Sequence, residues 1–149
     1  MDDVFEMLYA GRELHSSLFY PVCLKYRLTL AELLVLLFLA DHRQYDTARD
    51  VSERLKLAKS HVSVSVRDLE ERGYLRGGYQ GHDHRTIHLR LCAAADGVVA
   101  DAREARRQFR SVLEQGFTQE ELEALRGYLR RAADNVSAYL KRSSAPKAE

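Results

Sequence analysis

The sequence has few of the features that mark secreted or membrane-spanning proteins. Only two cysteines occur among 149 residues, Cys23 and Cys92, and one pair is not the disulfide framework of a small secreted domain. The longest apolar run, Leu33 to Ala40, is much shorter than the roughly 20 residues that cross a bilayer. The acidic N-terminus lacks the basic and apolar regions of a secretory signal. We therefore expect a cytoplasmic protein with reduced thiols and no membrane partner.

The chain also lacks a large net charge. Its formal net charge is +1, which argues against indiscriminate coating of nucleic acid. The total hides a local excess, because residues 54–90 hold eight Lys or Arg against four Asp or Glu, together with four of the six histidines. If the chain binds an anion, this middle third is the predicted place, and ordinary solvated charge is the alternative.

No catalytic constellation stands out in the sequence. The sequence pattern lacks a nucleophile with a nearby base, paired catalytic carboxylates, a phosphate-binding glycine loop and a strong metal motif. We therefore expect a protein that is not an enzyme and that carries no cofactor and no metal.

Helical periodicity predicts a mainly α chain. Residues 4–20 form an amphipathic pattern that Pro21 should kink or end. The spacing of Thr29 and Glu32 is that of a capping box, which begins a helix that is apolar nearly all round and belongs at the centre of the domain. A second box at Thr47 begins a short helix.

The rest of the chain predicts a hairpin and two more helices. Residues 74–76 and 87–91 read as strands, with residues 77–84 as a long, flexible, basic tip between them. Helical seams follow from Val98 and, after a third capping box, from Thr118. The small polar tail, residues 143–149, is predicted to be disordered.

The segment Ser60–Val66, SHVSVSV, alternates like a strand but lies between a turn and a glycine stop. At about 100° per residue it sorts cleanly as a helix, whereas the alternation fails after Val66 because Arg67 and Asp68 are both polar. The inward side would hold Ala58, Val62, Ser65, Val66 and Leu69. We therefore predict a helix whose outer face is small, hydroxylic and basic.

Such a face suits the major groove of DNA. Short side chains let a helix lie deep, serine hydroxyls bond phosphates or base edges, Val64 can meet a thymine methyl, and Arg67 can reach phosphate or guanine. A short helix, a tight turn, this helix and a basic hairpin together predict a winged helix-turn-helix.

Two sequence patterns in this region resemble the MarR family of bacterial transcription regulators. They are DLEERGYL at residues 68–75 and DxRxxxLxL at residues 83–91, and the resemblance extends over residues 4–142. It implies a winged helix-turn-helix at 29–92 and dimerisation helices at 1–28 and 93–142. The DNA-binding residues would be Lys59, Ser60, His61, Ser63, Val64, Arg67, His84 and Arg85, with Asp83 bracing Arg85 in the minor groove.

The resemblance also implies a mode of action. We expect a homodimer that binds double-stranded DNA at a palindromic operator, acts as a repressor and is released by a small-molecule effector. The effector crevice would lie near His15, Tyr20, His42 and Tyr45, which are equally plausible as core residues. Val64 stands where relatives usually carry a basic residue, so we expect it to set a distinct DNA preference.

Three alternatives stay open at this point. His82, Asp83, His84 and His88 could form a metal cluster on the wing, although a basic wing near phosphate explains them as well. Cys23 could be a thiol sensor, although no activating base is evident. The winged helix could also be a protein-interaction module without DNA binding.

Overall fold

The computed structural model describes residues 2–144, which form helices and a β-hairpin. The elements are α1 (Asp3–Tyr26), α2 (Leu30–Asp41), α3 (Ala48–Leu55), α4 (Lys59–Glu71), β1 (Leu75–Gln80), β2 (Asp83–Leu91), the 3-10 turn η1 (Ala93–Ala95), α5 (Asp96–Glu114) and α6 (Gln119–Ser143). The chain divides within α5 into two compact units, residues 1–110 and residues 111–149. The predicted fold class, mainly α with a small β-hairpin wing, is confirmed.

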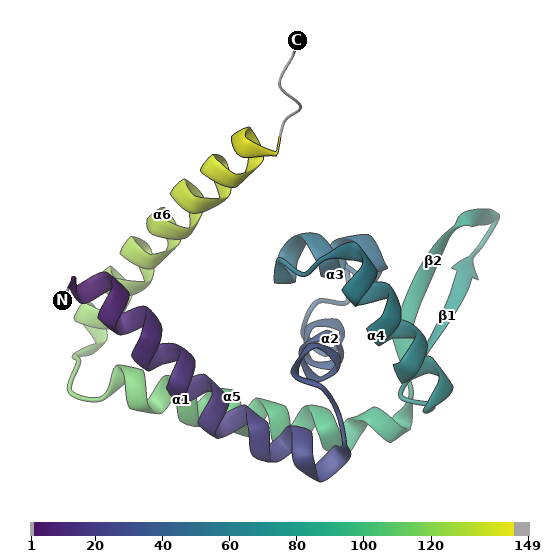
Figure 1. The fold of residues 1–149 in the computed structure, drawn as a ribbon, viewed down its shortest axis with the longest axis horizontal. Coiled ribbons are helices and arrows are strands. Elements are labelled where there is room, and N and C mark those ends of the chain that lie inside the picture. Colours follow the sequence, from purple (N-terminus) through teal and green to yellow (C-terminus); the bar gives the residue numbers. More distant parts are fainter. Residues whose placement is uncertain (1, 145–149) are drawn as a thin grey trace. The chain divides into compact units, whose positions relative to one another are not determined.

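Helix α2 is the centre of the first unit, as its apolar sequence predicts. Eight of its residues are buried, and Leu33, Val35 and Leu36 have no exposed surface. Figure 1 shows α2 end-on, with α3 and α4 on one side and α1 and α5 on the other. The amphipathic faces of these helices therefore meet around one shared core.

The three capping boxes predicted from the sequence all form. At α2, the Thr29 hydroxyl accepts the N–H of Glu32 at 3.2 Å, and the Glu32 carboxylate accepts the N–H of Thr29 at 2.8 Å. Boxes at Thr47 and Thr118 begin α3 and α6 in the same way. Each box pairs backbone N–H groups that the first turn of a helix leaves without partners.

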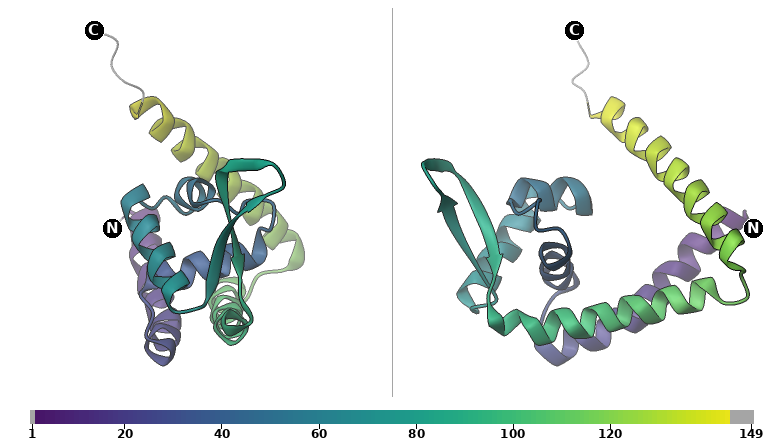
Figure 2. Two further views of the ribbon diagram at one scale, coloured as in Figure 1. Left: turned by 90° about the vertical axis from the view of Figure 1, so that its right-hand side faces the viewer. Right: turned by 180° about the vertical axis from the view of Figure 1, so that it is seen from behind.

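Pro21 does not end the first helix. Helix α1 runs through it to Tyr26 and contains it within its length. Proline removes one helical N–H, but both Pro21 and Ser17 are exposed, so water can bond the carbonyl of Ser17 that loses its partner. Figures 1 and 2 show α1 beside α5, where the Tyr26 hydroxyl donates to Asp101 at 2.8 Å.

The wing differs from the predicted long loop, because its strands continue almost to the tip. Strand β1 extends to Gln80, which pairs with Asp83, so Gly81 and His82 form the turn. At the base, Leu75 pairs with Leu91. Gly77 and Gly78 are strand residues in this hairpin, and we predicted a loop there because glycine is rare inside strands. The left view of Figure 2 shows the hairpin from its side of the molecule.

The second unit consists of the end of α5 and helix α6. Helix α6 ends at Ser143, so this residue is helical and not part of a disordered tail, and residues 145–149 lie outside the described part of the chain. No described residue of α6 is buried. Among the described residues, none of the helices combines the length and apolar content needed to span a membrane.

Candidate nucleic-acid interface

Helix α4 presents the predicted outer face to solvent. Val62, Ser65 and Leu69 are 1%, 3% and 0% exposed and point into the core, which confirms the helical assignment. The predicted contact residues of this helix are all exposed, namely Lys59, Ser60, His61, Ser63, Val64 and Arg67. The helix ends where predicted, because Gly73 follows with φ at 76°, a conformation that glycine adopts without strain.

The polar groups on this face are only loosely engaged within the protein. The Ser63 hydroxyl donates to the carbonyl of Lys59 at 2.9 Å, which leaves its oxygen lone pairs as outward acceptors. Arg67 lies 3.6 Å from Asp68, and both side chains are exposed enough for solvent to screen the pair. Ala58 precedes the helix without a side-chain cap, so the first-turn N–H groups stay available to an anion. The helix therefore offers donors, acceptors and one lightly held guanidinium.

The wing carries the other predicted contacts. Arg85, His84 and Asp83 are all exposed. Asp83 accepts the backbone N–H of Arg85 at 2.9 Å, so it braces the backbone beside the turn and not the guanidinium. This hydrogen bond, followed by one from Thr86, lowers the pKa of Asp83. Asp83 therefore holds the main chain at Arg85 and does not bind the Arg85 guanidinium.

Two basic residues of the middle third have structural partners. Arg72 donates to the carbonyls of Tyr26 and Arg27, each at 2.7 Å, and so ties the end of α1 to the end of α4. The Arg54 guanidinium lies 3.4 Å from the centre of the Tyr45 ring, which is a cation–π contact. Two of the eight basic residues of this region therefore make contacts within the protein.

Three residues near the interface were not singled out from the sequence. Tyr79 is exposed on the wing, and its ring meets that of His84 edge-on with centroids 5.3 Å apart. Glu70 and Asp46 bind the wing through contacts with residues 7 and 42 positions away. A single sequence carries no signal for such pairs, because their members lie in different elements that only the fold brings together.

The four predicted effector residues have different ring partners, although the N–H of Tyr45 donates to the carbonyl of His42 at 2.9 Å. His15 stacks on Phe19 with ring centroids 4.2 Å apart, and burial lowers its pKa. His42 stacks on Phe38, and Tyr45 lies under Arg54. Tyr20 is 62% exposed. They remain a prediction, and none of them lines the cavity described next.

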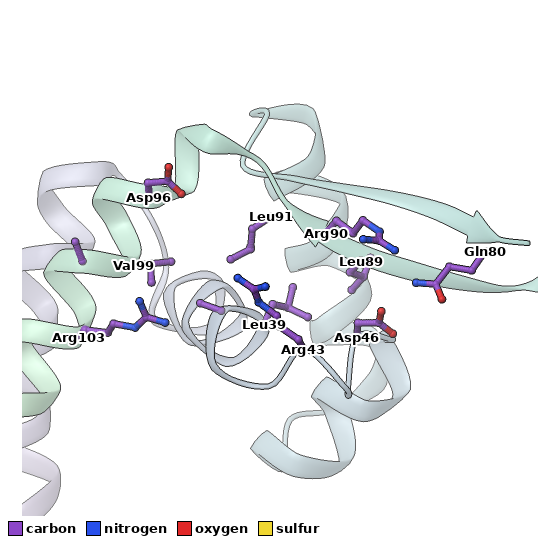
Figure 3. A pocket seen from close by; sticks show the side chains of 12 residues that line it. Leu39, Arg43, Asp46, Gln80, Leu89, Arg90, Leu91, Asp96, Val99 and Arg103 are labelled. Atoms are coloured by element: carbon purple, nitrogen blue, oxygen red, sulfur yellow. The ribbon is translucent and has the colours of Figure 1, made fainter.

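A cavity of about 660 Å³ lies between the end of α2, the wing and α5. Leu39, Leu89, Leu91 and Val99 give it an apolar floor. Figure 3 shows three arginines around it: Arg43 follows α2, Arg90 belongs to the wing and Arg103 comes from α5. Asp46, Gln80 and Asp96 also line it, so the three arginines outnumber the two aspartates on an otherwise apolar and amide surface. A cavity with this excess of cationic groups can take a small organic anion.

Beside this cavity, one aspartate joins α2 to α5. Asp41 accepts from Arg103 at 2.8 Å and from Arg106 at 2.5 Å. Burial by itself raises the pKa of Asp41, but the hydrogen bonds from the two arginines outweigh it, so the pKa is lowered overall. The side chain of Asp41 is only 18% exposed, which limits screening by solvent.

We expect an Asp41→Asn variant to lose about 1 kcal/mol of unfolding free energy at neutral pH. A lowered pKa in the folded state stabilises above the unfolded value, about 3.9, and this stabilisation disappears as the pH falls through the folded pKa. Urea unfolding of both proteins at pH 7 and at about pH 2.5 measures the difference. Glu53→Gln, which breaks an exposed pair with Arg49, is the control and should change little at either pH. An Asp41 effect of equal size at both pH values would contradict the assignment.

The structure also bears on the metal and thiol alternatives. Asp46 lies 2.6 Å from Nδ1 of His88, and His84 packs on Tyr79, so these side chains have other partners. Within residues 2–144, no group of three or more potential ligands is placed to hold a metal ion. Cys23 is buried, and this burial raises the pKa of its thiol, which disfavours the reactive thiolate.

Known proteins share both the winged segment and the whole fold. The model of the MarR family matches residues 28–86. The chain is similar to a putative MarR family transcriptional regulator from Listeria monocytogenes in complex with a 26mer DNA. The TM-score is 0.84 and the identity 16%, over 100% of this chain and 99% of that chain.

Two further solved structures extend the comparison. The transcriptional regulator PA3341 is 26% identical with a TM-score of 0.77, over 90% of this chain and 98% of its own. Bordetella bronchiseptica BpsR, whose DNA binding is regulated by 6-hydroxynicotinic acid, is 20% identical with a TM-score of 0.68, over 89% and 99% of the two chains. No curated protein sequence matches the chain significantly. Residues 28–86 thus match the model of the MarR family, and the whole chain has the winged helix-turn-helix fold of solved MarR family transcription regulators.

Proposed function

We propose that this protein is a homodimeric repressor that binds a palindromic DNA operator. One observation carries the proposal. The exposed face of α4 has small, hydroxyl-bearing side chains together with Arg67, which is only weakly paired, and the adjoining wing exposes Arg85. A helix of this kind fits the major groove, and a basic wing fits the groove beside it. The similar Listeria monocytogenes regulator was solved with DNA, which supports the same role for this chain.

Exposed apolar residues support the homodimer. In the first unit, the start of α1 leaves Val4, Phe5 and Leu8 more than half exposed. In the second unit, α6 exposes a series of large side chains, namely Tyr128, Leu129, Val136 and Tyr139. Apolar surface of this extent is typical of an interface, and we assign regions 1–28 and 93–142 to dimerisation.

Selection of bound DNA from a random pool tests this proposal. A dimer with two recognition helices should enrich an inverted repeat whose half-site centres lie about 34 Å, one helical turn, apart. Affinity for the selected site should fall steeply with salt, because bound Lys and Arg release counterions from the phosphates. Failure to enrich any sequence would overturn the proposal and favour a protein-interaction module.

We further propose that the arginine-lined cavity takes the effector, a small organic anion. The cavity touches α2, the wing and α5, so an occupant could change how the wing and the recognition helix are held. BpsR, a similar structure, is regulated by the aromatic carboxylate 6-hydroxynicotinic acid, which makes that compound a sensible first probe.

We expect an Arg43→Gln and Arg90→Gln double variant to need roughly tenfold more of an aromatic carboxylate to release DNA. Both arginines line the cavity, and glutamine removes the charge with little loss of volume. Fluorescence anisotropy of labelled operator, titrated with a panel that includes 6-hydroxynicotinic acid, gives the midpoints. An Arg49→Gln and Lys56→Gln double variant removes two exposed charges outside the cavity lining and is the charge-matched control. Identical midpoints for wild type and double variant, with an active compound, would place the effector elsewhere.

A further inference from the structure

Each strand of the wing is held to the helix-turn-helix by a contact with one acidic residue outside the wing. On β1, the N–H of Gly77 donates to Oε1 of Glu70 in α4 at 2.9 Å. On β2, Asp46 accepts the N–H of Leu89 at its carbonyl, 2.7 Å away, and its Oδ1 lies 2.6 Å from Nδ1 of His88. We propose that Glu70 and Asp46 are positioning residues that hold the wing at a fixed angle to the recognition helix. This inference rests on the proposed DNA-binding function.

The strand beside the Glu70 contact is closely packed at position 77. A Cβ there would lie 2.9 Å from Cγ2 of Ile87, so a larger residue would force Ile87 or β1 to shift. The same Cβ would lie 3.6 Å from Oε1 of Glu70, which is ordinary van der Waals contact. Glycine therefore fits β1 against Ile87 while its N–H makes a charge-assisted hydrogen bond with Glu70.

The Asp46 contact holds the second strand at two successive residues. Asp46 lies in the connection between α2 and α3, and both its side chain and that of His88 are about one-fifth exposed. Leu89, whose N–H it accepts, is buried. A strand bonded through one side chain and the next backbone amide can neither slide nor turn without losing a contact. Each strand thus has its own anchor.

The direction of the change in DNA affinity on removal of Glu70 tests the positioning role. Glu70 carries a negative charge on the helix that would face DNA phosphates, and such a charge by itself weakens binding. Removal of the carboxylate should therefore tighten binding if charge is all that matters. If Glu70 positions the wing, its removal should weaken binding in spite of the lost repulsion.

The first test needs no DNA. Amide hydrogen exchange of the full chain should show faster exchange at Gly77 and along the wing in Glu70→Ala. Asp46→Ala keeps the backbone carbonyl that accepts the N–H of Leu89, so it should loosen β2 less, through the lost contact with His88 alone. Glu70→Gln should restore slow exchange, because its amide oxygen can accept the same N–H. Glu71→Ala, one residue along α4 and without a bond to the wing, should match the wild type. Wing exchange in Glu70→Ala that equals the wild type would overturn the tether.

The second test uses the DNA site that the wild type selects. Glu70→Ala should bind it roughly fivefold more weakly and lose hydroxyl-radical protection under the wing while keeping it under the recognition helix. Glu71→Ala should bind as tightly as the wild type or more tightly. Binding by Glu70→Ala at wild-type strength or better would overturn the positioning role. If the wild type selects no DNA, the proposed function fails, whereas the exchange experiment still decides whether the two carboxylates tether the wing.

Discussion

A Leu69→Ala variant should lose about 3 kcal/mol of unfolding free energy. Leu69 is fully buried on the inner face of α4 and belongs to the core cluster that includes Leu36 and Leu75. Removing three carbons from such a site costs the transfer free energy of the lost atoms and leaves a cavity that close-packed neighbours fill only in part. Because the same helix carries the residues proposed to face DNA, we also expect weaker operator binding near physiological temperature.

Val64→Ala is the matched control on the same helix. Val64 is 45% exposed on the outer face, so its truncation should change the free energy of unfolding by less than about 0.5 kcal/mol. Urea unfolding at one fixed protein concentration compares the two variants, since the unfolding of the proposed dimer would depend on protein concentration. Equal losses from both variants would contradict the inward and outward assignment of the helix. The control should alter instead the sequence that the protein selects, if Val64 meets a thymine methyl in the proposed complex.

Features that depend on neighbouring residues could be predicted from the sequence. The box of Thr29 and Glu32 forms as expected, because both partners lie within one helical turn. The assignment of Ser60–Val66 to a helix held for a similar reason: the inward positions repeat at the helical period, and core packing outweighs the strand propensity of valine. The prediction of which residues of α4 face outward followed from this assignment to a helix.

The errors arose where the surroundings override a local rule. Pro21 was expected to kink or end α1, and the helix does not end there, because its exposed position lets the helix run on to Tyr26. Glycines 77 and 78 were read as a loop, whereas pairing with β2 keeps them in a strand. In the second case glycine serves the close approach of Ile87 and Glu70, which is a property of the folded neighbourhood and not of the segment.

Parts of the candidate site could not be reached from the sequence at all. The contact of Asp46 with His88 joins residues 42 positions apart, and the cavity draws on α2, the wing and α5. No periodicity links such positions, so only the fold brings them together. By contrast, the exposure of Arg67 and Arg85 followed from a helix period and a hairpin pattern, and the structure has both side chains in solvent.

Arg85→Ala should bind the selected operator about 10- to 100-fold more weakly, and the slope of log K against log salt should flatten by about one. The guanidinium is exposed, and Asp83 holds the backbone N–H and not the side chain, so alanine leaves the turn of the wing intact. The loss then reports the contact with DNA and not a change of fold. Salt-titrated gel shifts on one DNA fragment give both the affinity and the slope.

Arg85→Lys and Arg67→Ala separate the possible sources of that loss. Lysine keeps the charge, so the salt slope should stay, but it cannot reproduce the flat, multiply bonding guanidinium that fits a narrow groove. Arg67→Ala should weaken binding to a similar degree and relax the preference for particular bases, since Arg67 lies on the helix that would read the major groove. Retention of full affinity and slope by Arg85→Ala would remove the wing from the interface. The same result for Arg67→Ala would remove the outer face of α4 from the interface, and full affinity in both variants would place DNA binding on another surface of the protein.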